Sequence, residues 1–184
     1  MSWPAVVRAT HWVNVLLLSL LWLSGGVLWL EGDAALGWLV HAHALTGFAL
    51  MTSLLIRIAA LFDSEQPRAH WRDMVPLTAG QRAVFRATLR HYLTLGRAPD
   101  PDWQGHNPLA GMVYLLLFAL LLLQGLLGAL IYLQGVDALK SVHGVLALVL
   151  LVLASGHVLM VFYHEWRQKG CRISALVHGG NDPP

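Results

Sequence analysis

Four long apolar stretches limit this chain to folds that cross a lipid bilayer as helices. One crossing needs roughly 20 helical residues, whereas the strands of a membrane barrel would be shorter and would alternate apolar with polar residues. The composition agrees, because 57% of the 184 residues are hydrophobic and 12% are charged. We therefore expect an all-α integral membrane protein, a single four-helix bundle over residues 1–184, with spans at about residues 12–30, 38–62, 109–133 and 142–163.

The basic residues predict how the chain is oriented. Eleven of the twelve lysines and arginines lie before the first span, near the end of the second, in the middle loop or after the fourth, and only Lys140 lies elsewhere. The positive-inside rule then places both termini in the cytoplasm. This distribution accounts for the net charge of +2 without a nucleic-acid partner. The lone Cys171 excludes a disulfide framework and the C-x-x-C-H motif of covalently attached haem.

The middle loop, residues 63–107, is too long to be a plain turn. Within it, residues 78–95 alternate apolar side chains with Arg82, Arg86 and Arg90 at helical spacing. This pattern predicts a helix on the inner membrane surface, although an ordinary solvated helix packed on the bundle would be equally basic. Both interpretations remain open from the sequence.

Histidines inside the apolar spans are the strongest functional signal. Ionisable residues in membrane helices are costly, so their presence suggests a function. His143 and His157 are fourteen residues apart on the fourth span, which places them on one helix face about 21 Å apart along the axis. That spacing suits two cofactors, one near each membrane surface.

Each haem iron would need a second axial ligand at the same depth. His11 begins the first span on the inner side, and His43 begins the second span on the outer side. The expected pairs are therefore His43 with His143 and His11 with His157. Two histidines fill both axial positions of a haem iron and favour electron transfer over oxygen binding.

Alternatives to this ligand set remain. His41 competes with His43, from which it is turned by about 200° on a helix; we prefer His43 because it lies deeper and shares a face with Gly47. A single membrane histidine often forms only a hydrogen bond to a neighbouring helix. A non-redox protein whose histidines bind zinc or copper is a further alternative, but such ligands would cluster at one depth.

The histidines belong to three longer motifs. These are Arg8-x-x-His11-Trp12, His43-x-x-x-Gly47 with Arg57, and Lys140-Ser141-x-His143 followed by His157 and His164. The motifs resemble the bacterial cytochrome b561 family, which includes the cytochrome b subunits of nickel-iron hydrogenases. The resemblance implies a protein of the bacterial cytoplasmic membrane with two haems b, which passes electrons between the quinone pool and a c-type cytochrome or a periplasmic dehydrogenase or hydrogenase.

The resemblance also implies roles for individual residues. The four ligands it implies are the same four histidines. By analogy with a related formate dehydrogenase subunit, a quinone would bind near Asn107, His106, His157 and His164. Arg8 and Arg57 would lie near the propionates of the inner haem.

Two of these implications have alternatives. Asn107-Pro108 is also a good helix start. Some members of the family oxidise superoxide at the outer face and pass the electron to quinone. Here Lys140 could attract the superoxide anion.

Overall fold

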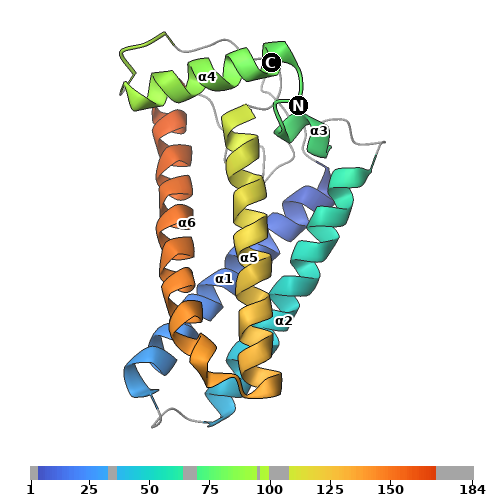
Figure 1. Ribbon diagram of the computed structural model, residues 1–184, viewed down its shortest axis with the longest axis vertical. Helices are drawn as coiled ribbons and strands as arrows, with labels where there is room; N and C mark the ends of the chain where they lie inside the picture. The colour runs from blue at the N-terminus through green and yellow to red at the C-terminus, as the bar shows by residue number, and fades with distance from the viewer. Residues whose placement is uncertain (1–3, 33–36, 64–69, 95, 100–107, 169–184) are drawn as a thin grey trace. The chain divides into compact units, whose positions relative to one another are not determined.

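The computed structural model describes residues 4–32, 37–63, 70–94, 96–99 and 108–168, and the regular elements in these ranges are all helical (Figure 1). The all-α prediction is therefore confirmed for the described residues. The elements in chain order are α1 (Ala5–Glu31), α2 (Gly37–Ala59), η2 (Ala60–Phe62), α3 (Trp71–Met74), α4 (Ala79–Leu93), α5 (Pro108–Gln134), η3 (Asp137–Leu139) and α6 (Lys140–Gln168).

Within the described part of the chain, four segments are long and apolar enough to cross a membrane, as predicted: Ala5–Glu31, Gly37–Phe62, Leu109–Gln134 and Asp137–Phe162. Large apolar side chains on their outer faces, such as Leu23 and Val152, are about 70% exposed. A helix that is apolar on every face suits a lipid environment. The helices extend beyond most of the predicted bounds, because hydropathy marks only the apolar part of a helix.

The chain forms two compact units, residues 1–57 with 120–184 and residues 58–119. The first unit contains α1, α2, most of α5 and α6. Each of these helices contributes a buried apolar side chain, namely Val7, Leu54, Leu127 and Leu150. The end of α1, the start of α2, the end of α5 and the start of α6 lie at the same end of this unit (Figure 1). The helix ends on either side of residues 33–36 and of residues 135–139 therefore lie together.

The second unit contains α4, the helix predicted within the middle loop. Thr78 accepts a hydrogen bond from the Gln81 backbone amide, and the Gln81 side chain accepts one from the Thr78 backbone amide. This capping box satisfies two amides that the helix itself cannot pair. The prediction of a helix is thus confirmed, whereas its location on the membrane surface stays a prediction.

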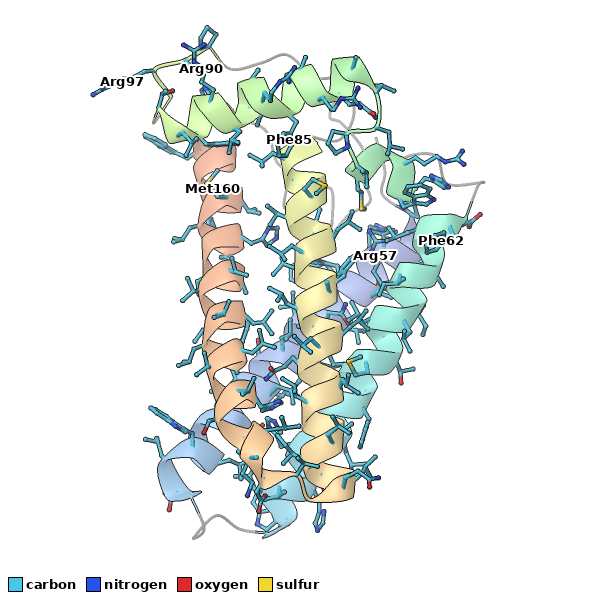
Figure 2. All side chains as sticks on the ribbon, in the orientation of Figure 1. Arg57, Phe62, Phe85, Arg90, Arg97 and Met160 are labelled. Atoms are coloured by element: carbon cyan, nitrogen blue, oxygen red, sulfur yellow. The ribbon has the colours of Figure 1, made fainter. Side chains whose placement is uncertain are left out.

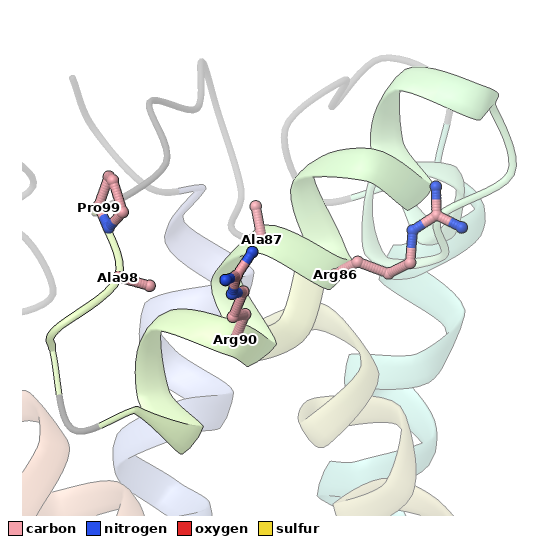
Figure 3. Close-up of a pocket in the computed structure, with 5 residues that line it drawn as sticks. All are labelled: Arg86, Ala87, Arg90, Ala98 and Pro99. Atoms are coloured by element: carbon pink, nitrogen blue, oxygen red, sulfur yellow. The ribbon is translucent and has the colours of Figure 1, made fainter.

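A pocket of about 370 Å³ lies along α4 and is lined by Arg86, Ala87, Arg90, Ala98 and Pro99 (Figure 3). The segment after α4 turns back here, because Nδ1 of His91 makes a 2.7 Å hydrogen bond with the backbone carbonyl of Ala98. Gly96 adopts a φ of 80° in this turn, a conformation that glycine accommodates without strain. These lining residues include none of the four predicted haem ligands, all of which the structure describes.

Gly111 allows α3 to pack closely against the first turns of α5. A Cβ atom at Gly111 would lie 2.6 Å from Cα and 2.7 Å from the carbonyl oxygen of Met74. Met74 is only 2% exposed, and backbone atoms cannot move aside as a flexible side chain can. The glycine is therefore required at this contact.

We expect Gly111→Ala to destabilise the second unit by about 1–3 kcal/mol, a range typical of overpacking. Limited proteolysis of the purified protein should then cleave residues 63–107 faster. Gly80→Ala is the matched control, because a Cβ at Gly80 meets nothing within 4 Å. Equal cleavage rates in the two variants would show that the contact does not limit stability.

Candidate functional site

The predicted ligand histidines all belong to the first unit and lie at two levels. His43 and His143 are near the starts of α2 and α6, at the end of the unit where α1 and α5 also end (Figure 1). His11 is in the second turn of α1, and His157 is fourteen residues after His143 on α6. The helical rise separates the two α6 histidines by about 21 Å.

The structure brings His43 and His143 together across α2 and α6. Their ring centroids are 6.3 Å apart, and the ring planes are inclined by 76°. Two imidazoles that ligate one metal ion from opposite sides, each at about 2 Å, have centroids about 6 Å apart. The spacing of this pair therefore leaves room for one metal ion between the rings.

His11 lies near His157 and Arg57 in the first unit. Both residues interact electrostatically with His11. Arg57, labelled on α2 in Figure 2, is only 9% exposed although its span is apolar. A buried guanidinium that interacts with the imidazole of His11 favours an anionic group at this level, because a buried charge requires a partner.

The imidazole of His43 is held by two consecutive residues of α1. Its Nδ1 is 2.8 Å from Oγ of Ser24. A Cβ atom at Gly25 would lie 3.2 Å from its Cε1, so this ring edge packs against the α1 backbone. The other ring nitrogen, Nε2, is not among the atoms within 4 Å of that Cβ position.

The imidazole of His143 is held in a similar way by α5. A Cβ at Gly128 would lie 3.2 Å from its Cε1. Gln124 lies one helical turn before Gly128. Its side-chain nitrogen is 3.2 Å from Nε2 of His143 and 3.1 Å from the backbone carbonyl oxygen of His143. Nδ1 of His143 is buried and has no hydrogen-bond partner among the described residues. Each ring thus packs against a glycine of the preceding helix, but the hydrogen bonds of the two rings differ.

His41 has different surroundings from His43. Its Nδ1 makes a 2.7 Å hydrogen bond with the hydroxyl group of Tyr132 on α5, and its side chain is exposed, whereas His43 is half-buried. The ring of His43, unlike that of His41, is paired with a histidine of α6. These contacts favour His43 as the ligand.

The predicted quinone group falls largely outside the described residues. His106 and Asn107 lie there entirely, and of His164 only the backbone, within α6, is described. Of this group, only the half-buried His157 is placed with its side chain. The quinone site therefore stays a prediction.

Sequence reasoning did not single out Ser24, Gln124 or Tyr132. Gln124 could have been found, because it is an amide within an otherwise apolar run of leucines. A polar side chain in a membrane helix usually forms a hydrogen bond to a neighbouring helix. Ser24 gave less signal, since a serine in a membrane helix can bond its own backbone.

The chain matches the family model described as prokaryotic cytochrome b561 over residues 2–179. The chain belongs to this family. No curated protein and no solved structure matches it. As a member of the cytochrome b561 family, it is a multi-pass bacterial membrane protein, a b-type cytochrome that binds haem b and takes part in electron transfer.

The residues of this cytochrome fit haem b in the first unit. The His43 and His143 rings have the spacing of opposed ligands, and Ser24 occupies Nδ1 of His43, which leaves Nε2 available. On the other side, the contact between Gln124 and Nε2 of His143 must open before that nitrogen can ligate.

Buried polar atoms in this unit also fit a polar cofactor. Those without a hydrogen-bond partner among the described residues include Nε of Arg8 and Oδ1 of Asn14, which lie on α1 within one turn of His11. A buried polar atom without a partner costs about 1–3 kcal/mol. Haem carboxylates or ordered water can satisfy an arginine there, so these atoms support a polar cofactor edge near His11.

We expect Gly25→Val to disturb the site of His43, because the added side chain would push the ring from its position. Gly26→Val is the matched control, since a Cβ at Gly26 meets nothing within 4 Å. Haem content per chain, measured by absorption of the purified cytochromes, should fall in the first variant and not in the second. Equal haem content in the two variants would show that the close contact between Gly25 and His43 is not needed for haem binding.

Proposed function

We propose that this cytochrome binds two haems b in the first unit, one ligated by His43 and His143 and the other by His11 and His157. The observation that carries the proposal is the 6.3 Å separation of the His43 and His143 ring centroids. The electrostatic interaction of His11 with His157 supports the second pair. Two histidines would hold each haem iron from both sides, and the haem would supply a redox centre that keeps both ligands in its ferric and ferrous states.

The protein's own residues set the positions of the haems and the environment around them. Each pair joins α6 to another helix, α2 in one case and α1 in the other. Because both α6 ligands share one helix, their spacing is fixed by the helical rise at about 21 Å. A rigid spacing of this kind suits electron transfer between the two membrane surfaces.

Arg57 and Arg8 are the proposed partners of the propionates of the haem near His11. Arg57 is almost fully buried and interacts with His11, and Nε of Arg8 is buried without a described partner. Guanidinium groups form charge-assisted hydrogen bonds with carboxylates. These two arginines would therefore offset the charge of the propionates and fix the orientation of the haem.

We propose that both termini are cytoplasmic, which places the haem of His43 and His143 near the periplasm and the other near the cytoplasm. The distribution of lysines and arginines supports this orientation. The outer haem would then exchange electrons with a c-type cytochrome or another periplasmic redox protein, and the inner haem with quinone.

The quinone would bind near Asn107, His106, His157 and His164. An asparagine amide can donate a hydrogen bond to a quinone carbonyl, and a histidine can accept or release the proton that accompanies quinone reduction. The half-buried His157 lies on α6, whose helical backbone continues past His164. This places both histidines in the last half of the same helix.

The alternative activity, oxidation of superoxide at the outer face, has less support. It relied on Lys140 to attract the anion, but Nζ of Lys140 lies 2.8 Å from a carboxylate oxygen of Asp137. This ion pair weakens the positive field at that face. A multi-histidine zinc or copper site also has less support, since no group of three or more ligand side chains gathers within the described ranges.

We expect two haems b per chain by pyridine haemochrome analysis. His143→Ala and His157→Ala should each remove one haem, and the remaining haem should differ between the two variants in its redox potential. His41→Ala is the control and should keep both haems, because His41 contacts Tyr132 instead. A single haem in the parent protein, or haem loss only from His41→Ala, would refute the ligand set.

The proposed quinone site is tested by Asn107→Ala. Loss of one hydrogen bond should slow the reduction of the haems by a quinol about three- to tenfold, as measured by stopped-flow absorption. Reduction by dithionite, which needs no quinone site, should keep its rate and serves as the control. An unchanged rate with quinol would remove Asn107 from the site.

A further inference from the structure

The hydroxyl group of Ser24 holds the ring of His43 from a neighbouring helix. We propose that Ser24 is a positioning residue that fixes the proton of His43 on Nδ1, directs Nε2 to the iron and lowers the reduction potential of that haem. This inference rests on the proposed function, because it takes His43 as an axial ligand. It adds a residue that touches neither the iron nor the substrate.

The direction of the hydrogen bond follows from the surroundings of Ser24. Its single hydroxyl proton is used within α1, since Oγ is 2.7 Å from the carbonyl oxygen of Leu20. Oγ can therefore only accept from His43, whose Nδ1 is 2.8 Å away. A neutral imidazole carries one proton, so Nδ1–H leaves Nε2 as the nitrogen with a free lone pair.

The contact with Gly25 brings the same ring edge against α1. Cε1 of His43 would be 3.2 Å and Nδ1 3.8 Å from a Cβ at Gly25, so the ring edge that includes Nδ1 faces α1. Rotation of the ring by 180° about its Cβ–Cγ bond would turn Nδ1 away from Ser24. The glycine thus leaves room for the ring against α1, and the hydrogen bond with Ser24 selects which way the ring is flipped.

The opposite ligand, His143, has no equivalent acceptor among the described residues. Its Nδ1 is buried without a described partner, and Gln124 contacts Nε2 and the backbone carbonyl instead. The two ligands of this haem therefore differ in their donor strength. Hydrogen bonding at the far nitrogen raises the basicity of a ligating histidine, so His43 would be the stronger donor.

A stronger donor favours the ferric state over the ferrous state. Loss of the Ser24 hydroxyl should therefore raise the reduction potential of the haem at His43. The haem at His11 and His157 should be unaffected, because its α6 ligand lies about 21 Å away along the helix. The second haem thus provides an internal reference in the same molecule.

The test compares Ser24→Ala with Ser24→Thr and Ser19→Ala in the purified cytochrome with both haems bound. Threonine retains a hydroxyl acceptor. Ser19 lies on the same helix, is exposed, and its Oγ donates to the Val15 carbonyl oxygen at 2.8 Å, so its substitution removes the same kind of helix hydrogen bond. The readouts are a potentiometric titration of each haem and the electron paramagnetic resonance g-values of the ferric protein.

We expect Ser24→Ala to keep two haems and to weaken the preference of one haem for the ferric state by roughly tenfold. Its g-values should shift because the ring is no longer fixed. Ser24→Thr and Ser19→Ala should match the parent protein. Two haems with unchanged potentials and g-values in Ser24→Ala would overturn the role of Ser24.

Failure of the proposed function would look different. His43→Ala that retains both haems would show that His43 is not a ligand, whatever Ser24→Ala does. If Ser24→Ala lost a haem, the threonine variant would decide: recovery of the haem would support the hydroxyl as a positioning group, and continued loss would refute it.

Discussion

The energetic cost of imidazole groups inside an apolar bundle is the constraint on which the rest of this structure depends. Histidine nitrogens in a membrane span need partners, because no bulk water is present to solvate them. Here one pair faces across α2 and α6 at 6.3 Å, and another lies near the buried Arg57. The arrangement of α1, α2, α5 and α6 is best understood as a way to provide those partners. Two haems, as proposed, would complete it.

Glycines make the required approach of the helices possible. Gly25 and Gly128 each let a histidine ring of the following helix lie against the backbone, and in both cases Cε1 of the ring would be 3.2 Å from a Cβ atom at the glycine. At Gly125, a Cβ atom would collide with the Met51 side chain of α2. Small residues at helix contacts are common in membranes because packing, not hydrophobicity, holds the helices together. In this cytochrome they also shape the space around the histidines.

Much of this fold follows from the sequence alone. Hydropathy located the four spans, and the amphipathic pattern located α4, because both depend on local composition. The contacts of Ser24 and Gln124 were not predicted, since they depend on the rotation of one helix against the next, which no local pattern records. The rotation of α2 about its axis also decides that His41 contacts Tyr132 whereas His43 pairs with His143. The sequence favoured His43 without excluding His41, and it reached the quinone residues His106 and Asn107 only through the family resemblance.

The hydrogen bonds that hold His43 and His143 connect neighbouring helices and span only 19 residues of chain in each case. Each ring is therefore oriented within its own helical hairpin, α1 with α2 or α5 with α6. Contacts of such short range form early, because little chain entropy is lost in closing them. Each hairpin can present a preformed half of the cofactor site as it enters the bilayer. Haem capture would then add ligation between the two hairpins to contacts such as that of His41 with Tyr132, which couples cofactor supply to assembly of the bundle.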